Sequence, residues 1–386
     1  HHSIEQNKNN WLFGLGANQY YGNHFGQVTK ILALSTPEQN PPREYYRGIG
    51  NKSDVNAFVK FNRRVAFGQN DKTRGSVYAD MQLRKVNHVG SGTDNDLRTI
   101  DFKGNFLFFN PKAGFQLQHA TYHHITGYVG VANREPSRSD FTDNLSGDVP
   151  RPERMVNGEL SYLSTFPALP TINGKSSDNH FRINAYYMHY KDQLVLTGKI
   201  NDVGAYTRMN VPNSYRLGIE LMHTTILTSK LQLSSNITFS RNKIKSFTEF
   251  IDNYDTGNQD AITRNNTDIA FSPNFIAAST LAYKPVKQFT IELQTKWVGK
   301  QYLDNSSLQE RSLEAFANQD ISGSYEFAKK VNRSFLLTAR VNNISNQRYI
   351  PNGYSYAYVY GGETIIANGY YPMATINYLI GFTIKF

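Results

Sequence analysis

Hydrophobic and polar residues alternate with a period of two along most of the chain, and the period of an α-helix is almost missing. From Leu231 onward, for example, Leu233, Ile237 and Phe239 continue an apolar set whose neighbours are all polar. Successive side chains on a β-strand point to opposite faces, so each such segment has one apolar face and one polar face. The alternation predicts about fourteen strands, near residues 11–17, 54–66, 76–86, 105–118, 123–132, 153–164, 180–190, 215–227, 231–241, 274–283, 288–298, 313–327, 334–343 and 375–386.

The links between these strands alternate in length. Short links at 119–121, 228–230 and 284–287 contrast with long polar ones at 18–53, 133–152, 191–214, 242–273 and 344–374. A barrel in an outer membrane has short turns at one rim and long loops at the other. A soluble sandwich also alternates, but its strands usually have about five or six residues. We therefore expect an all-β fold, a transmembrane antiparallel β-barrel. The link at 165–179 is longer than this pattern predicts.

Composition narrows the class further. The 386 residues include no cysteine, which excludes disulfide scaffolds, thiol chemistry and iron–sulfur clusters. The mean hydropathy is −0.53, and no apolar run approaches the roughly 18 residues that a membrane-spanning helix needs. The first residues do not form a secretory signal, so we expect a processed protein or part of a longer one.

Several motifs, taken in their order along the chain, resemble TonB-dependent outer-membrane receptors, in particular those of Bacteroides-like bacteria. The resemblance lies in the run Asn133-Arg134-Glu135-Pro136-Ser137-Arg138, the strand end at 187–194, the run 341–349 and the terminal strand at 379–386. It implies a location in the outer membrane and a role in TonB-dependent uptake.

The resemblance also implies partners. Receptors of this family have about 22 strands around a plug, so about fourteen strands would be the C-terminal portion of the barrel, residues 1–386. The plug, the first strands and contact with the TonB energy transducer would then belong to residues outside this sequence. A sheet that is not closed would expose unpaired backbone groups to lipid. The rival interpretation is a complete, passive diffusion barrel of about fourteen strands.

Motifs for catalysis or metal binding are missing. Carboxylate pairs such as Asp94 and Asp96 lie in polar loops, and neither a phosphate-binding glycine loop nor a zinc-protease motif occurs. His123 and His124 are adjacent on a strand and would point to opposite faces. We expect no enzyme activity, no cofactor and no metal site.

The net charge of +10 does not indicate nucleic acid, because no recognition helix is readable and the charges are dispersed. Lysine and arginine at the long-loop rim could bind lipopolysaccharide phosphates or attract an anionic ligand. An acidic plug that balances a basic lumen would also explain the net positive charge.

Two sets of residues are candidates for ligand binding. Arg134 and Arg138 could contact a ligand or could pair with carboxylates of the barrel or the plug. Tyr354, Tyr356 and Tyr358 lie in a long loop, where large rings provide contact area at low entropic cost. An aromatic girdle at the membrane interface is the other interpretation of the tyrosines.

The last strand carries the expected barrel-assembly signal, Gly381, Ile384 and Phe386. Its alternation predicts that Ile380, Phe382, Ile384 and Phe386 face lipid and that Thr383 and Lys385 face the lumen. Leu379 is an apolar exception on the lumen side.

The function that these observations favour is active uptake of a scarce nutrient, such as an iron chelate or a similar cofactor. Haem is less favoured, because the Arg134–Arg138 run contains no histidine. Oligosaccharide import with a surface lipoprotein partner remains open, because loops rich in tyrosine and asparagine also suit sugars.

Overall fold

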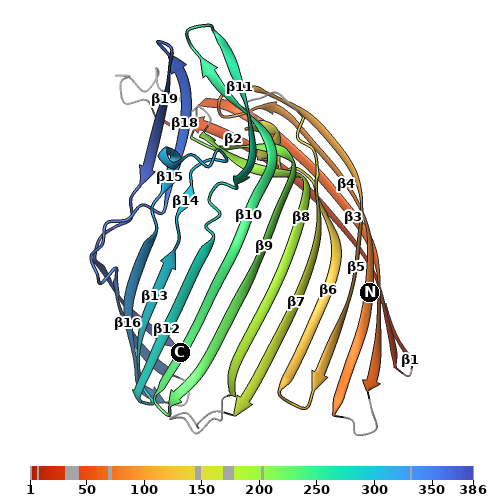
Figure 1. The fold of residues 1–386 in the computed structure, drawn as a ribbon, viewed down its shortest axis with the longest axis vertical. Coiled ribbons are helices and arrows are strands. Elements are labelled where there is room, and N and C mark those ends of the chain that lie inside the picture. The colour runs from red at the N-terminus through yellow and green to blue at the C-terminus, as the bar shows by residue number, and fades with distance from the viewer. Residues whose placement is uncertain are drawn as a thin grey trace.

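A computed structural model describes residues 2–6, 8–30, 43–67, 72–143, 149–167, 178–200, 204–330 and 333–385. Long antiparallel strands form one curved wall, which runs in Figure 1 from β2–β4 at the right to β16 at the left. The wall strands are β2 (Asn9–Val28), β3 (Arg43–Phe67), β4 (Thr73–Thr93), β5 (Thr99–His119), β6 (His123–Arg134), β7 (Glu153–Pro167), β8 (Asp178–Ile200), β9 (Tyr206–Thr228), β10 (Leu231–Asn253), β12 (Phe275–Val286), β13 (Phe289–Val298), β16 (Phe316–Lys330), β17 (Arg333–Asn342) and β20 (Asn377–Lys385). Each of the fourteen predicted strands falls on one of them, which confirms the all-β fold class.

The remaining elements are short. They are β1 (His2–Gln6), β11 (Asn258–Asp268), β14 (Gln301–Tyr302), β15 (Ser312–Leu313), β18 (Asn352–Tyr360), β19 (Glu363–Tyr371), the helix α1 (Arg138–Thr142) and the 3₁₀ turn η2 (Gln309–Arg311). Among these, β1 was not predicted from the sequence; it pairs with the first residues of β2.

Residue registers join the wall strands in chain order, from β1–β2 to β17–β20. For the described residues, these registers include no pair between β20 and either β1 or β2. β1 pairs with β2 from Asn9 to Phe13, so the same edge of β2 from Gly14 onward has no partner in β1. Trp11, in the first of the predicted strands, is paired with Ile4 of β1.

The two faces of the wall differ as the alternation predicts. On β4, Met81 and Leu83 are exposed on the outer face, whereas Val86 and His88 are buried on the inner face. On β20, Ile380, Phe382 and Ile384 are exposed on the same outer face. The lumen-side exception is also confirmed, because Leu379 pairs with Arg340 and lines an inner hollow with it.

Aromatic residues mark two borders on the outer face. At the short-turn rim, Trp11 packs on Phe61 with ring centroids 4.5 Å apart. At the other border, Trp297 packs edge-on against Phe275 at 6.0 Å. From Phe289 to Trp297, β13 advances eight residues, or roughly 26 Å along the strand at about 3.3 Å per residue. At the tilt of roughly 35–45° that is typical of outer-membrane barrels, this length rises about 20 Å, most of the roughly 25 Å height of their apolar band.

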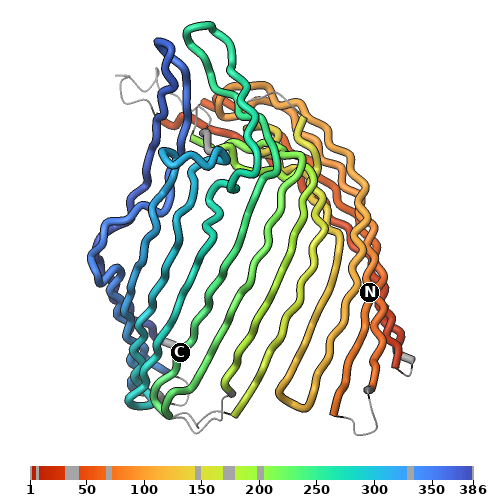
Figure 2. Tube along the Cα trace, in the orientation of Figure 1, coloured from red at the N-terminus to blue at the C-terminus, as the bar shows by residue number. Residues whose placement is uncertain are grey.

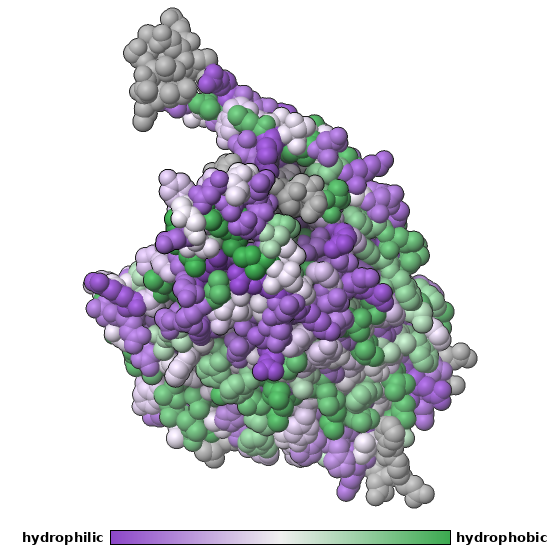
Figure 3. All heavy atoms as spheres, turned by 45° about the horizontal axis from the view of Figure 1, so that its top comes forward, coloured by the Kyte–Doolittle hydropathy of each residue, from purple (hydrophilic) through white to green (hydrophobic). Residues whose placement is uncertain are grey.

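The strands continue well beyond this band at the long-loop rim. Much of 18–53, 191–214 and 242–273, expected as loops, is instead strand-paired, as in β2–β3, β8–β9 and β10–β11. The β18–β19 hairpin likewise occupies part of 344–374. Above the band both faces of a hairpin leave the lipid, so the alternation fades while the backbone ladder continues. Figure 2 shows the hairpins rising above the wall, and in Figure 3 hydrophilic residues gather over this rim.

Candidate functional site

The segment after β6, residues 134–143, packs on the inner face of β3–β5. Glu135 is buried, and its carboxylate accepts hydrogen bonds from Lys52 Nζ at 2.5 Å and from Arg84 at 2.7 and 2.9 Å. Arg84 also donates to Asp54. Burial opposes ionisation of Glu135, but the bonds from Arg84 and Lys52 outweigh it and hold the pKa of the carboxyl below its ordinary value. Glu135 was not among the predicted site residues, although it lies within the run Asn133-Arg134-Glu135-Pro136-Ser137-Arg138.

The two candidate arginines of this segment are both ion-paired with barrel carboxylates. Arg134 Nε lies 2.9 Å from Glu153, and the arginine side chain remains 59% exposed. Arg138 Nη2 lies 3.1 Å from Asp94 and packs over Gly48. This geometry supports the packing interpretation, and contact of either arginine with a ligand stays a prediction.

An aromatic cluster holds the same segment against the wall. The Phe102 and Phe141 rings are stacked at 4.2 Å, and the buried His88 ring meets both edge-on. Burial and the neighbouring Lys52 charge lower the pKa of His88, although a hydrogen bond with the Pro136 backbone acts in the opposite direction. His88 is therefore held mainly as a neutral ring.

The candidate tyrosines of β18 form one row. Tyr354, Tyr356 and Tyr358 alternate with Ser355 and Ala357, which are buried. The Tyr356 and Tyr358 rings are stacked at 6.3 Å, and Tyr254 of the β10–β11 turn meets Tyr358 edge-on at 5.6 Å.

We call Tyr254, Tyr354, Tyr356 and Tyr358 the tyrosine row. Tyr254 was not predicted, because it lies about a hundred residues earlier in the sequence. Within the row, Tyr254 and Tyr356 expose large parts of their rings.

The tips of the β10–β11 and β18–β19 hairpins are joined. Asp252 and Asn253 of β10 pair in parallel with Tyr358 and Val359 of β18. The Asp255 carboxylate accepts the backbone N–H groups of Gly361 and Gly362, each at 2.8 Å. Both glycines have positive φ, which suits this residue type and turns their N–H groups toward the carboxylate. These bonds, first that from Gly362, lower the pKa of Asp255. We call this the tip contact.

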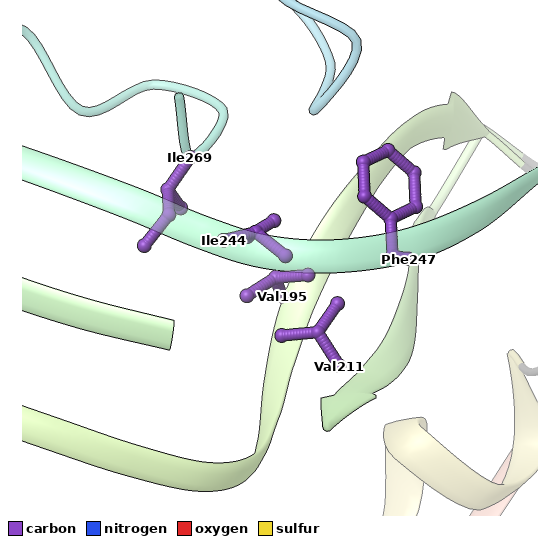
Figure 4. Packing of buried hydrophobic residues seen from close by; sticks show 5 residues of the cluster. All are labelled: Val195, Val211, Ile244, Phe247 and Ile269. Carbon is purple, nitrogen blue, oxygen red and sulfur yellow. The ribbon is translucent and has the colours of Figure 1, made fainter. Parts of the chain in front are cut away.

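A small hydrophobic core stabilises the hairpins above the wall. Val195 of β8, Val211 of β9, Ile244 and Phe247 of β10, and Ile269 are buried against one another (Figure 4). Strands from two hairpins thus share one interior, and these hairpins are packed structures where the sequence analysis expected loops.

A buried ion network lies beside this core. Arg311 is 2% exposed and pairs with Glu249 at 2.5 Å and with Asp304 at 2.7 Å. Arg264 binds the other oxygen of Glu249 at 2.7 Å. Burial raises the pKa of Glu249, but Arg311 and Arg264 outweigh burial and hold it below its ordinary value. The network connects β10 and β11 to the 299–315 segment.

An inner cavity of about 410 Å³ opens on the lumen face of β7–β10. Its lining includes Glu159, Glu220 and Arg216. The Arg216 guanidinium donates to the neutral oxygens of Ser272 at 3.0 Å and Asn242 at 3.3 Å. The lumen face therefore presents polar and charged groups of both signs at this cavity.

The described part of the chain contains no cluster of three or more histidine, aspartate or glutamate side chains arranged to hold a metal. In those same ranges, no helix has the length and apolar character needed to cross a membrane.

The comparison with protein families decides the assignment. The family described as TonB dependent receptor-like, beta-barrel, matches residues 2–344. The chain belongs to this family.

Solved structures of TonB-dependent receptors are similar in fold. The ferric-catecholate import receptor Fiu from E. coli K12, in its closed form, is 11% identical and matches 100% of this chain and 53% of its own, with a TM-score of 0.63. The copper transporter OprC is 14% identical, and the match covers 100% of this chain and 54% of OprC, with a TM-score of 0.63. The ferric citrate transporter FecA is 12% identical, and the match covers 99% of this chain and 52% of FecA, with a TM-score of 0.63. The chain thus spans about half the length of these structures. No curated protein matches it.

Membership in the TonB-dependent receptor family confirms the predicted location in the outer membrane. The long-loop rim is then the extracellular rim, and the short-turn rim faces the periplasm. The family comprises receptors and transporters and implies a plug and contact with TonB. Assignment to the Bacteroides-like subgroup stays a prediction.

The predicted assembly signal of this receptor barrel is only partly described. Gly381 packs closely against Thr338, and Ile384 lies on the outer face opposite Phe335. Phe386 and the side chain of Lys385 lie outside the described residues. A role of the three residues in assembly stays a prediction.

Proposed function

We propose that the chain is the C-terminal portion of a receptor barrel that takes up a scarce nutrient, an iron chelate or a similar cofactor, with energy supplied through TonB. The observation that carries the proposal is the packed set of extracellular hairpins above a family-typical barrel wall. Their core, ion network and tip contact order the tyrosine row before any solute arrives. Capture at low concentration benefits from such order, because less conformational freedom is lost on binding.

The proposed sequence of events breaks no bond of the solute. The tyrosine row and the exposed part of Arg134 contact the solute at the extracellular rim. TonB then acts on the plug, and the solute passes the polar lumen face, including the inner cavity beside Arg216. Fiu and FecA are named for ferric complexes and OprC for copper, which supports a metal or a metal complex as cargo.

The same proposal assigns the plug and the remaining strands to residues outside this sequence. Its support is the absence of a register between β20 and β1 or β2 among the described residues, since an open edge in lipid is very costly. The intact polypeptide purified from outer membranes should be clearly heavier than the 43.9 kDa of this chain. A mass of 43.9 kDa in a functional barrel would support the passive-barrel alternative.

Growth assays test the transport proposal. A deletion strain should fail to use at least one ferric chelate or cobalamin at limiting concentration, and loss of TonB should cause the same defect. If deletion abolishes use of one glycan and leaves every chelate in use, the receptor instead imports an oligosaccharide, with a surface lipoprotein as the expected partner. Uptake that persists without TonB would contradict active transport.

A further inference from the structure

Two histidines face each other across the β5–β6 hairpin. The register pairs His119, the last residue of β5, with His123, the first residue of β6. In the sequence His123 stands next to His124, but adjacent strand residues point to opposite faces, and His124 lies opposite Gln118 on the lumen face. His123 shares the outer face with the exposed Ile125. His119 and His123 are both exposed, and their hairpin turns at the short-turn rim, at the bottom of Figure 1.

Each of the two rings is oriented by a hydroxyl group on a neighbouring strand. His119 Nδ1 lies 2.8 Å from the hydroxyl oxygen of Thr73 on β4, and His123 Nδ1 lies 2.8 Å from that of Tyr162 on β7. The His123 and Tyr162 rings are also stacked, with centroids 6.0 Å apart and 10° between their planes. When Nδ1–H donates to the hydroxyl oxygen, the lone pair of the other ring nitrogen, Nε2, is free. A histidine that binds a metal ion typically donates its second ring N–H in this way.

The two imidazole rings are close enough to share one ion. Their centroids lie 6.4 Å apart, with 26° between the ring planes. Residues directly opposite each other in an antiparallel pair have Cβ atoms roughly 4.5–5.5 Å apart. Metal–nitrogen bonds of about 2.0–2.1 Å require the two Nε2 atoms to lie within roughly 4 Å of each other. Because both rings are exposed, rotation about their side-chain bonds can bring the two nitrogens to that separation.

We propose that His119 and His123 form a binding site for a divalent transition-metal ion, with water completing the coordination. Neutral imidazole suits zinc, nickel and copper, and among these divalent ions copper binds a given nitrogen site most tightly. Calcium and magnesium prefer oxygen ligands and do not fit this pair. A bound ion would join the two strands of the hairpin, and the Thr73 and Tyr162 hydroxyls would extend the connection to β4 and β7. The site is independent of transport, so its failure would leave the proposed uptake function untouched.

Titration of the receptor purified from outer membranes tests the site, with copper(II) chloride and zinc chloride as probes in a non-chelating buffer at neutral pH. His1 and His2 are adjacent and offer the same type of ligand, so both are replaced by alanine in every protein measured. The electron paramagnetic resonance spectrum of the tightest copper site should show coupling to two imidazole nitrogens. His119→Ala or His123→Ala should remove one coupling and weaken binding at least about 10-fold. Even the loss of a hydrogen-bond partner of a ligating histidine typically weakens metal binding about 10–100-fold.

The matched control is His124→Ala, which removes a histidine from the same hairpin but from its lumen face. It should leave the copper affinity and both nitrogen couplings unchanged.

Three results would overturn the proposal. The protein with alanine at positions 1 and 2 could bind neither copper nor zinc with saturation, which would mean that the pair holds no ion. His124→Ala could weaken binding as much as His119→Ala, which would place the ligands elsewhere. Both nitrogen couplings could persist in His119→Ala or in His123→Ala, which would exclude the altered residue as a ligand.

Discussion

Arg311 and Glu249 are 62 residues apart in the sequence and form an ion pair in the interior of the extracellular hairpins. The arginine is almost fully buried there and also holds Asp304. Replacing both partners of such a buried pair by apolar residues changes the stability little. Removing one partner alone leaves the other charge buried and unpaired, which is strongly destabilising. We therefore expect the Arg311–Glu249 pair to act mainly by fixing how β10 and the 299–315 segment pack against each other.

Arg311→Met should destabilise the extracellular hairpins by about 3–5 kcal/mol, because Glu249 and Asp304 lose their buried cation. Hydrogen exchange should accelerate in β10–β11 and in 299–315, with little change in the wall. Arg64→Met breaks the ion pair with Glu5, in which both side chains are largely exposed, and should cost no more than about 1 kcal/mol. Equal effects of the two variants would contradict a special role of burial.

Asp255→Asn should loosen the tip contact, because the charged acceptor of two backbone N–H groups is lost. Spin labels at positions 256 and 363 should show a broader distance distribution in the variant than in the parent protein. The contact should also depend on pH. The pKa of folded Asp255 lies below its ordinary value, so the stabilisation is complete at neutral pH and disappears as pH falls through that lowered pKa. A distribution unchanged by both the substitution and acid would refute this role.

Mild acid should loosen residues 135–143. Folded His88 has a lowered pKa, so between that value and the ordinary value of 6.5 the unfolded state binds more protons and stability rises with pH. The nearby Lys52 and Arg138 oppose protonation, whereas Glu135 favours it. Protection factors against hydrogen exchange in 135–143, which are corrected for the slower intrinsic exchange in acid, should fall from pH 7.5 to pH 5.5, about one unit either side of the ordinary pKa. In His88→Phe, which cannot titrate, the same pH change should leave the protection factors nearly unchanged; an equal fall would place the sensitive group elsewhere.

Leu293→Arg should destabilise the barrel in lipid by about 2–4 kcal/mol, because Leu293 lies midway between Phe289 and Trp297 on the outer face. The neighbouring Gln294 contacts Glu292 on the lumen face, so Gln294→Arg should cost far less. Urea unfolding in vesicles measures both. Similar losses would mean that the faces are assigned wrongly. Phe382 stacks on Phe335 and lies beside the tilted ring of Phe327 near the periplasmic border, so arginine there should cost less than at Leu293.

The wall could be predicted because each wall strand meets lipid on one face and a polar lumen on the other. This difference between the faces makes apolar and polar residues alternate along the sequence. Above the membrane both faces of a hairpin meet water or protein, so β11, β18 and β19 left no comparable signal. Their order comes from contacts between distant segments, as between Tyr254 and Tyr358.

The candidate site was predicted in part. The β18 tyrosines were found because they cluster in the sequence, and the structure brings them together in one row. The partners of Arg134 and Arg138 could not be named, because Glu153 and Asp94 become neighbours only through the sheet registers and the fold of the 134–143 segment. Glu135 and Arg311 gave no sequence signal, since a buried charge is recognisable only once its counter-charges are placed around it.

The hydrophobic core of Val195, Val211, Ile244, Phe247 and Ile269 lies outside the apolar band, in the aqueous part of the molecule. The backbone ladders that join the wall strands present an outer face matched to the bilayer, whereas this core is stabilised by the exclusion of water. A thinner or thicker bilayer would therefore strain the wall at a modest cost for each ångström of mismatch. The hairpins above it would keep their shape, so the receptor can present the same tyrosine row from membranes of different lipid composition.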